Sequence, residues 1–167
     1  TKILKIYTRR GNFVPNIVVG GRRLGNVSEQ RILGLYVDSA LKFTGHIRQL
    51  VQKVRRRTNA LLALSGAKWG PSCLSIRCLY RGYIESIIRY GLPLFYLHGN
   101  KNLLDSLQVA MNTCLRVITG LPRATKLEIL YDVADLPTLK DLFLTYGCLM
   151  VDRALRIPNS TAHNYVR

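Results

Sequence analysis

The pattern of the chain changes at residues 31–47, which read RILGLYVDSALKFTGHI. A compact apolar strand with a glycine in its middle stops at Asp38, which we expect to act as a turn or cap residue. A short polar turn then enters a helix that soon carries KVRRR at residues 53–57. This change of period predicts a small β element that leads directly into a helical region.

Strands are expected on the N-terminal side of this stretch and helices on its C-terminal side. Residues 3–7, 17–19 and 32–37 are short runs of β-forming residues, and Gly20 and Gly21 mark a tight connection. Apolar residues then recur at helical spacing, with a turn-rich stretch at residues 91–100. The predicted helices run up to Ser65, from a cap at Ser72 to about Tyr90, from Leu103 to Ile118 before Gly120, around residues 126–131, and from Leu139 to just before Pro158.

The expected fold class is α+β, predominantly α. A short β hairpin or sheet element at residues 1–40 would precede a bundle of about four helices at residues 41–158. Residues 159–167 are polar and are expected to form a loose tail. With 167 residues and 48% hydrophobic content, the chain is long enough to bury a core.

Charge points to a polyanionic partner. The chain has 25 Lys and Arg residues against 9 Asp and Glu, a net charge of +16, and its pI is about 10.3. An excess of this size attracts phosphate, so nucleic acid is the expected partner. An anionic membrane surface is the competing interpretation, but without a lipidation signal or a long apolar span no membrane partner is expected. Without a signal peptide, we expect an intracellular location, nuclear or cytoplasmic.

Catalytic chemistry is not predicted for this chain. No two of its nine acidic residues are adjacent, and Asp132 and Asp135, the nearest approach, are interpreted as a cap and a solvated charge. Its four cysteines lack zinc-binding spacing and are expected to be reduced core thiols. Gly20 and Gly21 do not form a phosphate-binding fingerprint. We therefore expect no catalytic residue, no metal and no cofactor in this chain.

Binding is better supported than catalysis, because cations gather in two runs. One run lies on the β element, and the other lies on the first predicted helix. A solvated surface is the alternative interpretation of either run, and KVRRR also fits a short nuclear localisation signal. The predicted nucleic-acid contacts are Arg48, Lys53, Arg55, Arg56 and Arg57, of which Arg55 is nearest the apolar stripe, with Arg77 and Arg81 as further candidates.

Several motifs together resemble a known family. They are LG-x-x-x-D-x-x-L-x-F-x-x-H-I from Leu33, WG at residues 69–70, YG-x-P from Tyr90, and the LQ, TG and LP pairs from Leu107 onward. Residues 1–150 resemble the C-terminal part of the reverse transcriptases that arthropod non-LTR retrotransposons of the jockey-like group encode. The chain lacks the Tyr-x-Asp-Asp motif that carries catalytic carboxylates in this family.

The resemblance implies that residues 1–40 hold the end of the palm and a primer-grip hairpin, with thumb helices following from residue 41. Leu33, Gly34 and Leu35 would form the primer grip, and a side chain at Gly34 would hold the nucleic-acid backbone away. A β-bulge or a close strand crossing is the alternative role for Gly34.

The implied function is to bind the template–primer duplex as part of an RNA-directed DNA polymerase. The chain alone would be inactive; the fingers and palm would be its partner, and the intact polymerase would use Mg²⁺. The alternative is a stand-alone basic helical protein, derived from a mobile element, that binds nucleic acid or acts as a scaffold.

Overall fold

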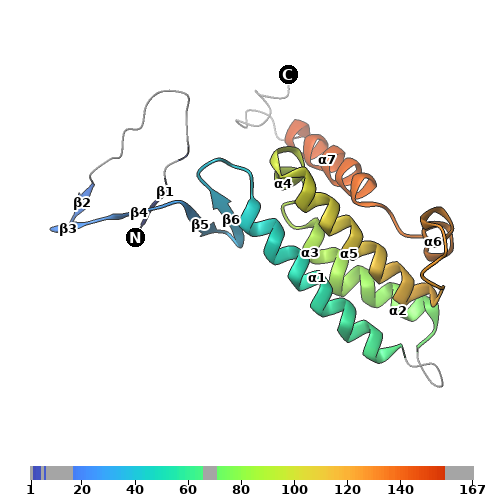
Figure 1. Cartoon of the computed structure of the whole chain (residues 1–167). Coiled ribbons are helices and arrows are strands. Elements are labelled where there is room, and N and C mark those ends of the chain that lie inside the picture. Colours follow the sequence, from blue (N-terminus) through green and yellow to red (C-terminus); the bar gives the residue numbers. More distant parts are fainter. Residues whose placement is uncertain (1, 5, 7–16, 66–70, 157–167) are drawn as a thin grey trace.

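The computed structural model describes residues 2–4, 6, 17–65 and 71–156. Figure 1 shows a body of packed helices with the strands extending from one end of it. The predicted tail at residues 159–167, the WG motif at residues 69–70, and residues 5 and 7 of the first predicted strand lie outside the described residues. The prediction of a mainly helical chain with short N-terminal strands is confirmed.

The strands pair in twos within the described part of the chain. β1 pairs with β4 in parallel, whereas β2 pairs with β3 and β5 with β6 in antiparallel fashion. Their bounds are β1 Lys2–Leu4, β2 Val18–Val19, β3 Arg22–Arg23, β4 Gly25–Val27, β5 Glu29–Ile32 and β6 Leu35–Asp38. Only the last of these pairs, the β5–β6 hairpin, leads directly into the helical body (Figure 1).

The single strand predicted at residues 32–37 is wrong, because a turn divides it. Ile32 pairs with Leu35, so Leu33 and Gly34 form a two-residue hairpin loop. Both loop residues have positive φ, 48° and 90°, as the favoured two-residue hairpin turns with matching twist require. Leucine is not a usual residue for such a turn, which is why the apolar run reads as one strand.

The helices follow the predicted order with two differences. Their bounds are α1 Thr44–Leu64, α2 Cys73–Tyr80, a π-helical turn Arg81–Glu85, α3 Ser86–Arg89, α4 Leu92–His98, α5 Lys101–Thr119, α6 Leu127–Ala134 and α7 Leu139–Arg156. The stretch at residues 91–100 was expected to be turns but contains α4, whose Pro93 sits in the first turn, where proline is tolerated. The π-helical turn is the second difference, since it interrupts the regular helix predicted there.

Predicted helix ends agree well with the structure. The Ser72 side chain accepts a hydrogen bond from the Ser75 backbone N–H at 3.2 Å, so the predicted cap is confirmed. Gly120 ends α5 with a φ of 67°, the left-handed conformation that glycine adopts readily. These two boundaries therefore agree with signals that lie within a few residues of them in the sequence.

The core lies between α1 and the helices that cover it. Ile47 and Val54 of α1 and Leu107 of α5 are fully buried. Ile47 and Val54 are seven residues apart, which places them on the same face of α1. A smaller contact joins α4 to α7, where the rings of Tyr96 and Phe143 stack with centroids 4.4 Å apart. The prediction of four core thiols is mostly wrong: Cys114 is buried, but Cys73, Cys78 and Cys148 are exposed.

Asp38 joins the hairpin to α1, and the predicted turn or cap role is confirmed. One carboxylate oxygen accepts from the Lys42 backbone N–H at 2.7 Å, and the other accepts from the Thr44 N–H at 3.2 Å. Within this connection, Leu41 and Phe43 take left-handed φ values of 55° and 51°. Non-glycine residues rarely adopt this region, so the connection needs these hydrogen bonds to hold it.

We expect Asp38→Ala to lower the free energy of unfolding by about 1–2 kcal/mol, because a helix loses its capping acceptor. The matched control is Asp105→Ala, which removes an exposed carboxylate from α5 and should change the free energy by less than about 0.5 kcal/mol. Urea unfolding followed by circular dichroism measures both. Equal effects of the two substitutions would contradict the capping role.

Candidate nucleic-acid interface

One face of α1 carries exposed cations and no opposing charge. Ile47, Val54 and Leu61 bury one side of the helix, which turns Arg48, Arg55 and Arg56 toward solvent. The sequence of α1, Thr44–Leu64, contains no Asp or Glu. Positive potential along this face is therefore not neutralised within the helix, and an extended phosphate backbone could pair with it.

Lys53 and Arg57 lie toward the opposite edge of that face and differ in surroundings. Lys53 is exposed and lines a small pocket beside the β5–β6 turn. The Arg57 guanidinium lies 4.3 Å from the ring centroid of Tyr83 and donates a hydrogen bond to the Tyr83 carbonyl oxygen. Arg57 therefore fixes α1 to the π-helical turn, and a cation–π contact already occupies its planar group.

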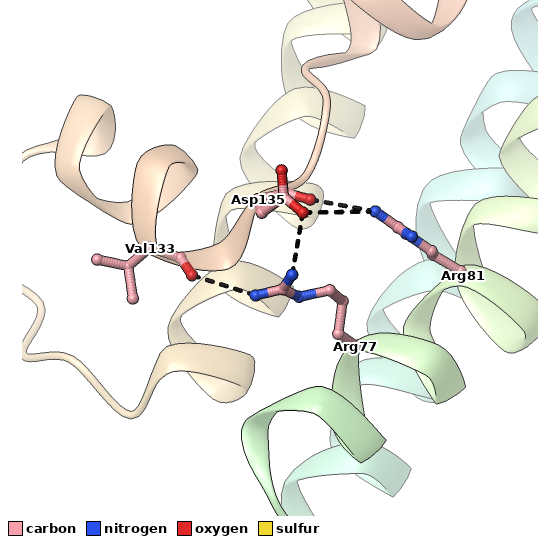
Figure 2. A network of polar contacts seen from close by, with 4 residues as sticks. All are labelled: Arg77, Arg81, Val133 and Asp135. Carbon is pink, nitrogen blue, oxygen red and sulfur yellow. Dashed lines mark hydrogen bonds and ion pairs between the residues drawn. The ribbon is translucent and has the colours of Figure 1, made fainter.

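Arg77 and Arg81 lie away from α1 and hold the end of α6. Figure 2 shows both guanidinium groups pointing toward the Asp135 carboxylate, at N–O distances of 3.0 Å and 4.0 Å. Arg77 also donates to the Val133 carbonyl oxygen at 3.4 Å, and Arg81 donates to the Asp135 carbonyl oxygen at 3.3 Å. Asp135 closes α6 with a φ of 49°, so both arginines stabilise a strained helix end.

Arg77, Arg81, Glu85 and Arg89 follow one another at intervals of four residues, but the π-helical turn Arg81–Glu85 interrupts the regular helix that would place them on one stripe. Glu85 is buried, and its Oε2 atom has no hydrogen-bond partner among the described residues. Burial raises the pKa of Glu85, while Arg89 and Arg81 act in the opposite direction. Arg89 in turn lies over the ring of Tyr146 at 4.3 Å, which joins α3 to α7.

The β5–β6 turn presents one apolar side chain to solvent and hides another. Leu33, at the tip, is 87% exposed, whereas Leu35 is buried. The Tyr90 hydroxyl donates a hydrogen bond to the Leu33 carbonyl oxygen, and a Cβ atom at Gly91 would lie 2.7 Å from Leu35 Cδ2. The LG and YG motifs, 57 residues apart in sequence, are therefore one contact in space.

Gly34 has a structural reason to be glycine. Its φ of 90° belongs to the turn, and a Cβ atom there would meet the Tyr90 ring at 3.4 Å. A β-bulge or a strand crossing does not account for this glycine, since it sits in a regular hairpin loop. Close approach of a nucleic-acid backbone stays a prediction.

The sequence did not single out Tyr90 or Tyr36 as site residues. Tyr90 holds the turn, and Tyr36 lies opposite Arg31, whose guanidinium is 5.9 Å from the tyrosine ring centroid. The YG-x-P motif contains Tyr90, but nothing in the sequence shows that Tyr90 contacts the hairpin. Tyr90, Tyr36 and Arg31 therefore lie near the turn in addition to the residues predicted for it.

The described part of the chain has neither a metal-binding cluster nor a membrane-spanning helix. Across residues 17–65 and 71–156, together with the few described before them, no group of three or more His, Cys, Asp or Glu side chains could hold a metal ion. Within the same part of the chain, every helix is too short or too polar to cross a membrane.

Comparisons with known proteins relate the chain to mobile elements. The 115 kDa protein of the type-1 retrotransposable element R1DM of Drosophila melanogaster is 33% identical over 82 residues, which are 49% of this chain and 8% of that protein. The RNA-directed DNA polymerase from the mobile element jockey, also of Drosophila melanogaster, is 23% identical over 159 residues, 93% of this chain and 17% of that protein. The matched region is thus less than a fifth of either curated relative.

The other two comparisons returned nothing. No protein-family model matches the chain, and no solved structure matches it.

We expect Leu33→Asn to raise the free energy of unfolding by about 1 kcal/mol, because asparagine tolerates positive φ and leucine does not. The matched control is Leu62→Asn, at another exposed leucine that lies inside α1. This control should lose a few tenths of a kcal/mol, since asparagine is a poorer helix former. Thermal and urea unfolding compare the two variants, and a destabilised Leu33→Asn would show that the turn does not strain its leucine.

Proposed function

We propose, from its distant homology to the reverse transcriptase proteins of non-LTR retrotransposons, that this chain grips the template–primer duplex for an RNA-directed DNA polymerase. One observation carries the proposal: α1, which presents an exposed basic face, also lines a pocket together with the hairpin turn. In this assignment the helices act as a thumb, and the β5–β6 turn acts as a primer grip.

The basic face suits a duplex better than a specific sequence. Arg48 and Arg55 are seven residues apart, two helical turns, and Arg56 flanks them, so their charges spread along the helix axis. Charges spaced in this way can follow a phosphate backbone, and phosphate contacts position a protein without reading bases. RNA–DNA hybrid and DNA duplex are both suitable ligands.

The turn supports the same assignment. Leu33 is apolar, exposed and in a strained conformation, and strain of this kind concentrates at functional sites. Asp38 and Tyr90 fix the turn relative to α1 and to α3. A contact at the turn and a contact along α1 would therefore be made in a constant register.

Catalysis would come from elsewhere in a longer polypeptide. We assign no catalytic residue to this chain, and we assign the fingers and palm, with the Mg²⁺ that such a polymerase would use, to its partner. An intracellular location, nuclear or cytoplasmic, belongs to the same proposal, because the template–primer duplex is found there.

The salt dependence of binding tests the proposal. We expect wild type to bind a fluorescent RNA–DNA hybrid with a steep fall of log affinity against log salt. In the triple variant Arg48/Arg55/Arg56→Gln, the slope should fall in magnitude by about 2–3, since each lost phosphate contact removes roughly 0.7–0.9.

The matched control is Arg123/Lys126/Lys140→Gln. It removes three exposed cations that lie far from α1 in the sequence, near α6 and α7. This control should keep the wild-type slope after a small uniform loss of affinity. Equal slopes in the two variants, or no binding by wild type, would refute the proposal.

A stand-alone basic protein is the second candidate, and the closed core favours it. Val54, Leu107 and Leu130 are fully buried by the chain's own helices. Against it stands an apolar groove of about 730 Å³ between α4 and α7, lined by Leu94, Leu97 and Val151 among others. Large apolar side chains are exposed along the groove, with Leu97 65% exposed, and exposed apolar patches of this kind mark interaction surfaces.

Gel filtration with a hydrophobic dye separates the two candidates. If the chain functions as part of a larger polymerase, we expect dye binding and self-association, both reduced by Leu97→Gln in the groove. The matched control is Leu74→Gln, at a leucine of similar exposure on α2, which should change neither. A monomer that binds no dye would favour the stand-alone protein.

A further inference from the structure

A small pocket with both polar and apolar walls lies where the hairpin turn, α1 and α3 meet. Its volume is about 180 Å³, below the roughly 300–1,000 Å³ of pockets for drug-sized ligands. Tyr36 and Tyr90 line it with aromatic rings, and His46, Gln49 and Lys53 line it from α1. The three α1 residues follow one another at helical spacing, so one side of that helix forms a wall of the pocket.

His46 forms part of the pocket wall, but its Nε2 atom is buried and does not open into the pocket. The residue is 8% exposed, its ring packs on Phe95 with centroids 5.3 Å apart, and no described protein group hydrogen-bonds its Nε2 atom. Burial, and secondly Lys53, lower the pKa of His46, so the imidazole is neutral near pH 7.

The lining fits a nucleobase better than a bare phosphate. Lys53 is the one cationic side chain that lines the pocket, and the neutral imidazole adds no second positive charge. Two tyrosine rings offer flat surfaces on which a base could stack, and the Gln49 amide offers both a donor and an acceptor for its edge. The small volume limits the ligand to one ring system.

We propose that this pocket receives a single unpaired nucleobase of the nucleic acid that α1 holds. The inference rests on the proposed function, because the rest of the strand must lie along the basic face. Lys53 lines the pocket and lies three residues from the exposed Arg56 of α1, so it would contact the phosphate that follows the inserted base. Tyr90 links the pocket to the turn through its hydrogen bond to the Leu33 carbonyl oxygen.

Three fluorescent RNA–DNA hybrids test the inference: one blunt, one with a single unpaired nucleotide at an end, and one with an abasic nucleotide there. We expect wild type to bind the extended hybrid roughly tenfold more tightly than the blunt one, the effect of one stacked and hydrogen-bonded base. The abasic hybrid should bind like the blunt one, since it adds a phosphate without a base.

Variants then locate the effect. Gln49→Leu, and separately Tyr36→Leu, should abolish the preference for the extended hybrid while keeping blunt-hybrid affinity and its salt slope. The matched control is Gln52→Leu, at an exposed glutamine elsewhere on α1, which should keep the full preference. Because Gln49 is only half-buried, its variant tests the pocket even if Tyr36→Leu is destabilised.

The outcomes separate this inference from the proposed function. Equal affinity for blunt and extended hybrids overturns the nucleobase site alone, provided that the salt slope is retained. An abasic hybrid that binds as tightly as the extended one also overturns it and indicates a phosphate site. Absence of binding to every hybrid refutes the duplex grip, and the nucleobase site with it.

Discussion

The hydrogen bonds of one carboxylate determine how the two parts of the molecule are joined. Asp38 accepts from the backbone of Lys42 and of Thr44, and so spans the whole connection between β6 and α1. Two of the residues it spans, Leu41 and Phe43, adopt left-handed φ values, which non-glycine residues rarely do. A connection this short has few ways to satisfy its backbone, and the direction in which α1 leaves the hairpin follows from that constraint.

A second constraint makes the joint rigid from the opposite side. Tyr90 and Gly91 contact the hairpin at Leu33, Gly34 and Leu35, so α3 and α4 support the same turn that Asp38 anchors to α1. The Glu29 carboxylate also lies against Gly45 in the first turn of α1, where a Cβ atom would come within 1.8 Å of its oxygen. An acid at a helix N-terminus is electrostatically favourable. The hairpin is thus fixed at several points.

Local signals predicted much of the fold, but contacts between distant residues decided the site. Helical spacing and the caps at Ser72 and Gly120 located most helices, because each signal lies within a few residues of its effect. The hairpin was misread since Leu33 is not a turn former, and α4 was missed since Pro93 and two glycines suggested turns. Arg57 could not be assigned from sequence, because its partner Tyr83 is 26 residues away. The same holds for Arg77, whose partner Asp135 is 58 residues away.

These internal contacts divide the positive charge into two kinds. The guanidinium groups of Arg57 and Arg89 lie over tyrosine rings, and that of Arg77 pairs with the Asp135 carboxylate of the same chain. Arginine can combine stacking with several hydrogen bonds in such contacts. The arginines of the α1 face have exposed side chains, so their charge is directed at solvent. A net charge of +16 therefore overstates what a ligand would meet at any one place, and the proposed grip depends on how the fold distributes that charge. The joint at Asp38 sets the direction in which α1 leaves the hairpin, and so it sets where this exposed charge lies relative to the turn.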